Sequence, residues 1–141
     1  MTTKTNDMTR SMRPLGITAI SLFFVFGTLM SGLAAFMLRF PGSVLEPLWG
    51  LNPRAREGFA VLGMRGAMLM AGVCLACMAA ALGLWRCTRW GLWMAVGILV
   101  INLAGDTTNA MVTGDLRALI GLPIGGLMIW YLVKQRRLFA R

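Results

Sequence analysis

The sequence predicts an all-α membrane protein: a bundle of four transmembrane helices, with a short interfacial helix between the first two spans. The chain has 141 residues, of which 57% are hydrophobic and only 13% are charged, whereas an average soluble domain has roughly 25% charged residues. The mean hydropathy is +0.71, and the apolar residues gather in four long blocks. Each block meets or approaches the roughly 20 residues that a helix needs to cross a hydrocarbon core.

The four spans are expected at residues 15–38, 59–85, 90–112 and 116–133, between polar, basic tails at residues 1–14 and 134–141. The first tail resembles the start of a signal peptide. The apolar stretch behind it is longer than a typical signal peptide core, so we expect an uncleaved first span. The second block is long enough to tilt or to protrude from the membrane.

The loop between the first two spans carries signals of ordered structure. Ser43 and Glu46 have the spacing of a capping box, which predicts a short helix over residues 44–49. The apolar side of this helix places it in the extracytoplasmic interface. Asn52 is placed to cap the next helix, with Pro53 at its first position, so the second helix is expected to start before it enters lipid.

Lys and Arg are concentrated on one side of this topology. That side holds the N-terminal tail, the loop between the second and third spans, and the C-terminal tail, with Lys4, Arg10, Arg13, Arg86, Arg89, Lys134, Arg136, Arg137 and Arg141. Because Lys and Arg collect in cytoplasmic loops, both termini are expected in the cytoplasm. The aromatic residues of the interface agree, since the same side carries Trp85, Trp90, Trp93, Trp130 and Tyr131. Trp49 falls on the opposite side.

The net charge of +9 indicates which partners to expect. Anionic lipid headgroups at the cytoplasmic face attract juxtamembrane Lys and Arg. Nucleic acid is not expected as a partner, because the basic residues lack a continuous polar face. The chain has no His, which excludes His-ligated haem, His-based zinc sites and His-assisted nucleophiles. We therefore expect no enzymatic activity, no cofactor and no metal site.

The strongest polar signal lies in the third span. Asn102, Asp106, Asn109 and Thr113 are spaced by four, three and four residues, which places them on one face of a helix. Amides and a carboxylate are costly against acyl chains, so this face is expected to point into the bundle or into a wet cavity. Arg65 of the second span is expected at a similar depth, where its guanidinium would pair with Asp106. These five residues form the candidate polar site.

Small residues predict where the helices pack. One face of the second span carries Gly72 and Ala76, which let another helix approach closely, so the second and third spans are expected to pack there. In the fourth span, Gly121 and Gly125 form a GxxxG motif that suits contact within the bundle or in a homo-oligomer. Pro123 lies between them and predicts a kink or a late helix start.

Cys74 and Cys77 have the CxxC spacing of redox proteins, which need an accessible thiol of low pKa. Here the pair lies in the middle of a span among apolar residues, and Cys87 is the only other cysteine in the chain. We expect the cysteines to serve as small buried hydrophobic groups.

Two functions fit these residues. The favoured one is a structural or accessory membrane protein that packs against itself or against another membrane protein. The alternative is a small transporter or channel with a polar site at Arg65, Asp106 and Asn109. A second carboxylate inside a span or a continuous polar path to the cytoplasm would favour the alternative, and the sequence contains neither.

Several short motifs carry a resemblance: residues 48–59, residues 86–91, Gly105-Asp106 with Asn109-Ala110, Gly114-Asp115, and residues 119–123. Together they resemble small, uncharacterised four-helix membrane proteins of bacteria, similar in layout to the DoxX-like group. The resemblance covers residues 48–133. It implies a four-span bundle in the bacterial inner membrane and offers no catalytic residues to transfer.

Overall fold

The computed structural model describes residues 14–114 and 120–139. Within these ranges the chain forms α1 (Leu15–Arg39), η1 (Glu46–Leu51), α2 (Pro53–Leu62), α3 (Met64–Trp85), α4 (Arg89–Thr113), α5 (Gly121–Lys134) and η3 (Arg136–Phe139), where η1 and η3 are short 3-10 helices. The predicted all-α fold is confirmed for this part of the chain. Three of the described helices, α1, α3 and α4, are long and apolar enough to cross a membrane, and α5 is a shorter apolar helix.

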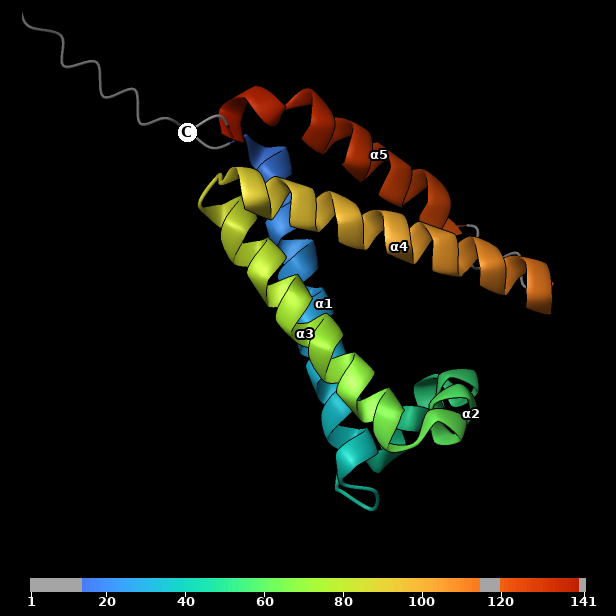
Figure 1. Ribbon diagram of the computed structural model, residues 1–141. Coiled ribbons are helices and arrows are strands. Elements are labelled where there is room, and N and C mark those ends of the chain that lie inside the picture. Colours follow the sequence, from blue (N-terminus) through green and yellow to red (C-terminus); the bar gives the residue numbers. More distant parts are fainter. Residues whose placement is uncertain (1–13, 115–119, 140–141) are drawn as a thin grey trace, which may run out of the picture.

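The first two long helices, α1 and α3, run antiparallel side by side (Figure 1). Small residues let them approach closely: a Cβ atom added at Gly27 would lie 3.5 Å from Sγ of Cys77, and one at Gly32 would lie 3.3 Å from Sγ of Cys74. The Cys74 thiol also donates a hydrogen bond to the carbonyl oxygen of Thr28, at 3.4 Å. Both cysteines are free; Cys77 is buried, as expected, whereas Cys74 is half-buried.

The other two apolar helices, α4 and α5, form a second antiparallel pair (Figure 1). The glycines of the predicted GxxxG motif face α4: a Cβ atom at Gly125 would collide with the side chain of Leu103, and one at Gly121 would lie 2.9 Å from Oδ2 of Asp106. The motif therefore serves a contact within the chain. Pro123 lies in the first turn of α5, where backbone N–H groups have no helical partner in any case. This agrees with the predicted late start.

The two pairs join at the turn between α3 and α4. The backbones of Gly83 and Gly91 touch there, so a Cβ atom on either glycine would overlap the other. The hydroxyl of Thr88 donates to the carbonyl oxygen of Gly83 at 3.0 Å and accepts from the amide of Gly91 at 3.4 Å. Cys87 has a φ of 51°, a left-handed conformation that is uncommon for a residue with a side chain. This tight turn holds the first residues of α4 against the last turn of α3.

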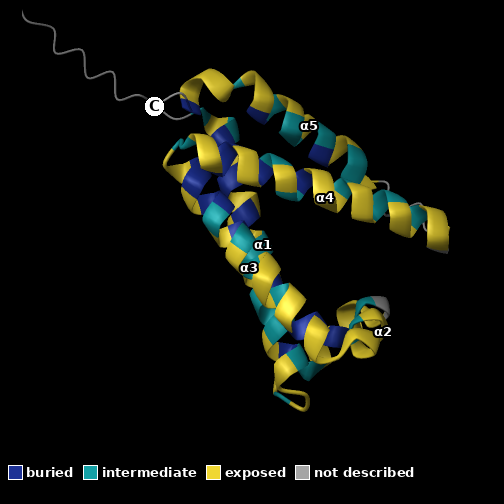
Figure 2. Ribbon diagram, in the orientation of Figure 1, coloured by how far each residue is buried: buried dark blue, intermediate teal, exposed yellow. Residues whose placement is uncertain are grey.

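From this turn α3 and α4 diverge, so the two pairs form an open V (Figure 1). The four-helix bundle that the sequence predicted is open on this side, because α3 packs along α1 through Cys74 and Cys77 and meets α4 mainly near the turn. Buried residues gather where the pairs join (Figure 2), and the core there includes Ile17, Phe24, Ala80, Leu84, Leu92, Ala95, Leu99, Leu132 and Phe139. Elsewhere the long helices expose large apolar side chains.

The second predicted span, expected as one helix over residues 59–85, is divided between α2 and α3. Gly63 separates the two helices with a φ of 52°, a conformation that glycine adopts without steric cost. The start of α2 is as predicted: Pro53 is its first residue, and the side chain of Asn52 accepts a hydrogen bond from the amide of Ala55 at 3.2 Å. The apolar stretch suited to a membrane therefore begins at Met64.

The short helix before α2 exists, but it covers Glu46–Leu51 instead of residues 44–49. The predicted capping box is absent. The hydroxyl of Ser43 is buried without a hydrogen-bond partner, and Glu46 reaches Arg56 of α2 instead, with Oε1 and Nη2 2.7 Å apart. Loss of the cap fits the 3-10 geometry of this segment, because a capping box serves the first turn of an α-helix.

Candidate functional site

Polar residues follow one face of α4, as their spacing predicted: Asn102, Asp106, Asn109 and Thr113. Nearer the turn, the same face carries Gly91, which touches Gly83, and Ala95, which is fully buried. Beyond the point where the helices diverge, Asn102 and Asn109 are exposed and Asp106 is half-buried. The polar residues thus begin where the packing between α3 and α4 ends. The side chain of Thr113 lies outside the described residues.

Asp106 faces α5. Its Oδ2 atom lies 2.9 Å from the position that a Cβ atom of Gly121 would take, and Gly121 is the first residue of α5. A helix N-terminus carries partial positive charge, which stabilises a nearby carboxylate. This placement gives a physical reason for tolerating a carboxylate inside an apolar helix.

A cavity of about 320 Å³ lies between α1, α4 and α5. Asp106 and Asn102 supply its polar side chains, and the other lining residues are Phe23, Leu99, Leu103, Gly121, Ile124, Gly125 and Met128. A site of this size and polarity can hold several water molecules, each of which needs polar partners. Two residues of the polar face of α4, Asn102 and Asp106, thus share this cavity, and their oxygen atoms are ligands that suit a small cation.

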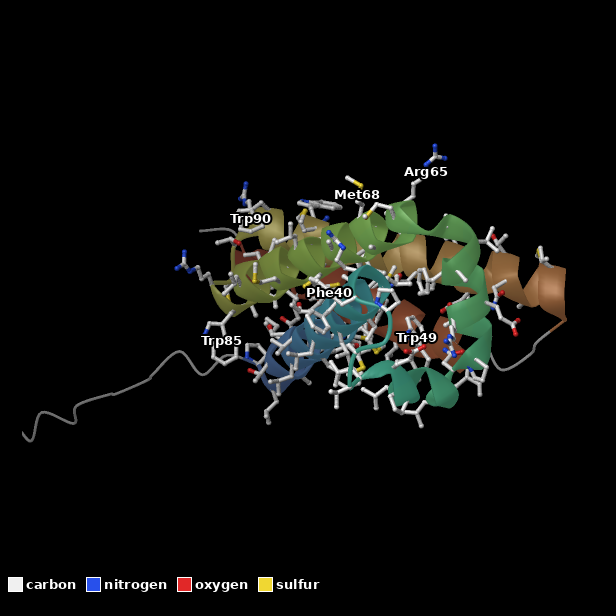
Figure 3. All side chains as sticks on the ribbon, turned by 90° about the horizontal axis from the view of Figure 1, so that it is seen from below. Phe40, Trp49, Arg65, Met68, Trp85 and Trp90 are labelled. Carbon is white, nitrogen blue, oxygen red and sulfur yellow. The ribbon has the colours of Figure 1, made fainter. Side chains whose placement is uncertain are left out.

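Arg65 does not belong to this cavity. It lies in the first turn of α3, where its side chain is exposed and points away from the helices (Figure 3). Within the described residues, the ion pair found is the one between Arg56 and Glu46. The predicted contact of Arg65 with Asp106 is therefore corrected: these two residues form no ion pair in the described part of the chain, and α3 and α4 diverge beyond their turn (Figure 1).

A second hollow lies between α3 and α4, on the inner side of the V. We call it the α3–α4 groove; it measures about 400 Å³ and is lined by Leu69, Gly72, Val73, Ala76, Ile98, Ile101 and Asn102. The small residues predicted to bring the two helices together lie here uncovered: a Cβ atom added at Gly72 would meet nothing within 4 Å. Sequence reasoning missed the groove, because a small-residue face does not reveal whether the same chain covers it.

Five basic residues lie at the end of the molecule where the two pairs join, around the α3–α4 turn and the end of α5: Arg86, Arg89, Lys134, Arg136 and Arg137. The rest of the described chain carries four more: Arg39, Arg54, Arg56 and Arg65. The carboxylates of the described residues lie away from this end, at Glu46, Glu57 and Asp106. Exposed tryptophans accompany the charges, and Nζ of Lys134 lies 4.6 Å from the ring centroid of Trp130. Tryptophan together with Lys and Arg marks a boundary between membrane and water.

The three long apolar helices, with aromatic and basic residues at one end, indicate a multi-pass helical membrane protein. Comparison of the chain with protein-family models, with curated proteins and with solved structures finds no significant match. The resemblance to small four-helix membrane proteins of bacteria stays a prediction.

Proposed function

We propose that this chain is an integral membrane protein of structural or accessory type, which acts by packing against itself or against another membrane protein. The α3–α4 groove is the observation that carries this proposal. It is an apolar, concave surface with small residues at its base, between two helices that are long enough to span a membrane. Helices associate in lipid through close packing at small residues, and a groove between two helices offers more such contact than a single convex helix.

In this proposal the chain crosses the bacterial inner membrane four times, with α5 as the fourth span. The 14 residues of α5 extend only about 21 Å, so the bilayer thins locally or flanking residues complete the crossing. Both termini lie in the cytoplasm, because the basic end holds the start of α1 and the end of α5. Anionic headgroups of the cytoplasmic leaflet bind this end.

Photo-crosslinking tests the proposal. A photoreactive amino acid replaces Ile101, which is 71% exposed and lines the groove, or the adjacent Val100, which is 51% exposed and lies outside the groove. The two positions share a helix and a depth, so Val100 is a matched control. We expect protein adducts from position 101 in native membranes and mainly lipid adducts from position 100. Lipid adducts alone at both positions would contradict the proposal.

A small transporter or channel is the second candidate, because Asp106 and Asn102 line the cavity between α1, α4 and α5. Arg65 lies outside this cavity, so the candidate rests on the carboxylate and the amide. Its test is the flux of protons or small cations into proteoliposomes that contain the purified chain. This function requires a flux that Asp106→Asn abolishes without loss of the folded protein. A flux equal to that of empty liposomes rules it out.

A further inference from the structure

We propose that the cavity between α1, α4 and α5 binds an organic cation, in which an ammonium group is carried by a compact apolar body. The ammonium group lies against the carboxylate of Asp106, and the apolar body lies among the aliphatic and aromatic side chains of the walls. This inference goes beyond the proposed function, since it depends neither on the α3–α4 groove nor on transport. It rests on the size and lining of the cavity and on the charge of Asp106.

The cavity has the size and composition of a small-molecule site. It measures about 320 Å³, and its lining is apolar except for Asp106 and Asn102. Sites for small molecules are usually apolar hollows of roughly 300–1,000 Å³, with a few polar groups that fix the orientation of the ligand. Two of the lining residues, Phe23 and Ile124, are 47% and 54% exposed, so part of the wall faces the surroundings of the helices. In a membrane those surroundings are acyl chains, which favour a ligand with an apolar body.

The carboxylate of Asp106 gives the cavity a negative charge. Among the residues that the structure describes, the ion pair found joins Arg56 to Glu46, so no basic side chain there neutralises Asp106. The first residue of α5, Gly121, lies beside the carboxylate. A helix N-terminus carries roughly half an elementary charge, which compensates the carboxylate only in part. A charge inside an apolar helix is costly unless it meets a partner, and a bound cation is such a partner.

The polar groups of the cavity suit an ammonium group better than a bare metal ion. Asp106 and Asn102, one helical turn apart on α4, offer a carboxylate and one amide oxygen. Calcium takes about six to eight oxygen ligands, and magnesium requires a nearly ideal octahedron. The N–H groups of an ammonium ion can donate to the carboxylate and to the amide oxygen. The rest of such a ligand needs only apolar contact, which the walls provide.

The ring of Phe23 supplies a further contact for a cation. Phe23 lines the cavity from α1, and its ring packs edge to face with the ring of Phe24, with the centroids 5.9 Å apart. Phe24 is buried in the core, so this contact limits the freedom of the Phe23 ring. The face of an aromatic ring attracts a cation. A carboxylate, an amide and an aromatic ring thus surround one apolar space.

Equilibrium binding to the purified full-length chain in detergent tests the site. The probe is tritiated adamantylamine, a rigid apolar cage with one ammonium group at neutral pH. Adamantanol is its uncharged counterpart, and adamantanecarboxylate carries the opposite charge. We expect saturable binding of the amine, about tenfold tighter than that of the alcohol, because a hydrogen bond between charged groups contributes more than a neutral one. The carboxylate should not displace the amine. Equal affinities for the amine and the alcohol, or no saturable binding of the amine, would overturn the proposal.

Four variants locate the bound cation. Asp106→Asn keeps the shape of the side chain and removes its charge, so the affinity for the amine should fall about tenfold, to that of the alcohol. Asp106→Glu restores the charge and should bind the amine more tightly than Asp106→Asn does. Phe23→Leu should weaken binding about threefold. Thr108→Val is the matched control, because Thr108 is exposed on α4 outside the cavity and its hydroxyl donates within its own helix. If Asp106→Asn binds the amine as the control does, the site is not at Asp106 and the proposal fails.

A second measurement uses the wild-type chain and does not depend on the folding of the variants. A ligand that binds the folded form raises its unfolding midpoint. We expect adamantylamine to raise the midpoint more than adamantanol does at the same concentration. Equal shifts with the two compounds, or no shift with the amine, would overturn the proposal. Neither measurement involves a flux or a crosslinked partner, so failure here is separate from failure of the proposed function.

Discussion

At the scale of the residue, the joining of the two helix pairs depends on two glycines. Because Gly83 and Gly91 have no Cβ atoms, the backbones of α3 and α4 can meet there. The backbones of Gly83 and Gly91 touch, and Thr88 connects the two helices through its hydroxyl. At Gly97 a missing Cβ atom has no such consequence, since one added there would meet nothing within 4 Å. The contact follows from the crossing of two helices, so the sequence around each glycine does not reveal it.

Gly83→Ala is expected to lower the stability of the folded chain by about 1–3 kcal/mol, the usual cost of overpacking. The new methyl group would overlap the backbone of Gly91, which cannot rotate away as a side chain can. The thermal unfolding midpoint in detergent, followed by circular dichroism, measures the effect. Gly97→Ala is the matched control in α4, where open space and better helix propensity predict no loss. Equal midpoints for the two variants would contradict the role of this contact.

Thr88→Val keeps the shape of the side chain and removes both hydrogen bonds of its hydroxyl. We expect a loss of about 1 kcal/mol, typical for an N-cap, and a lower unfolding midpoint. Thr88→Ser retains the hydroxyl and should stay close to the wild type. If the unfolding midpoint of the serine variant falls further than that of the valine variant, packing of the methyl group contributes more than the two hydrogen bonds do.

At the scale of the element, the helices were easier to predict than their breaks. Hydrophobic blocks about 20 residues long are strong signals, and Asn52-Pro53 marked the start of α2 correctly. The break at Gly63 was missed, because glycine within an apolar run is also common inside transmembrane helices. The capping box at Ser43 was wrong because Glu46 pairs with Arg56, a residue too distant in sequence to enter a local pattern.

Gly63→Ala is expected to strain the junction between α2 and α3. Gly63 has a φ of 52° and a ψ of −129°, which suit glycine and disfavour a residue with a side chain. We therefore expect the substitution to lower the free energy of unfolding by about 1–3 kcal/mol. The unfolding midpoint measures it, with Gly58→Ala as control. Gly58 lies inside α2, where an added Cβ atom meets nothing, and alanine there should be neutral or stabilising. If Gly63→Ala is as stable as Gly58→Ala, the junction does not depend on a conformation that only glycine adopts easily.

At the scale of the whole molecule, the open V could not be foreseen from the sequence. A helix face that meets lipid and one that meets another helix are both apolar, and small residues serve contacts within or between chains alike. The polar face of α4 was predictable, because the period of a helix aligns Asn102 with Asp106. The predicted pairing of Arg65 with Asp106 within the chain was wrong, because it required α3 and α4 to stay in contact far from their turn.

Orientation is the remaining whole-molecule property, and it follows from the gathering of basic residues at one end. We expect Leu51→Cys, exposed in η1, to react with a membrane-impermeant maleimide in intact cells, because the positive-inside rule places η1 outside. Arg136→Cys, at the basic end, should react only after the membrane is permeabilised. Cys87 is expected on the same side as Arg136, so both variants also carry Cys87→Ser, and the Cys87→Ser chain without either new cysteine is the control; Cys74 and Cys77 lie in α3. Labelling of the Arg136→Cys variant in intact cells would show the opposite orientation, with η1 on the cytoplasmic side.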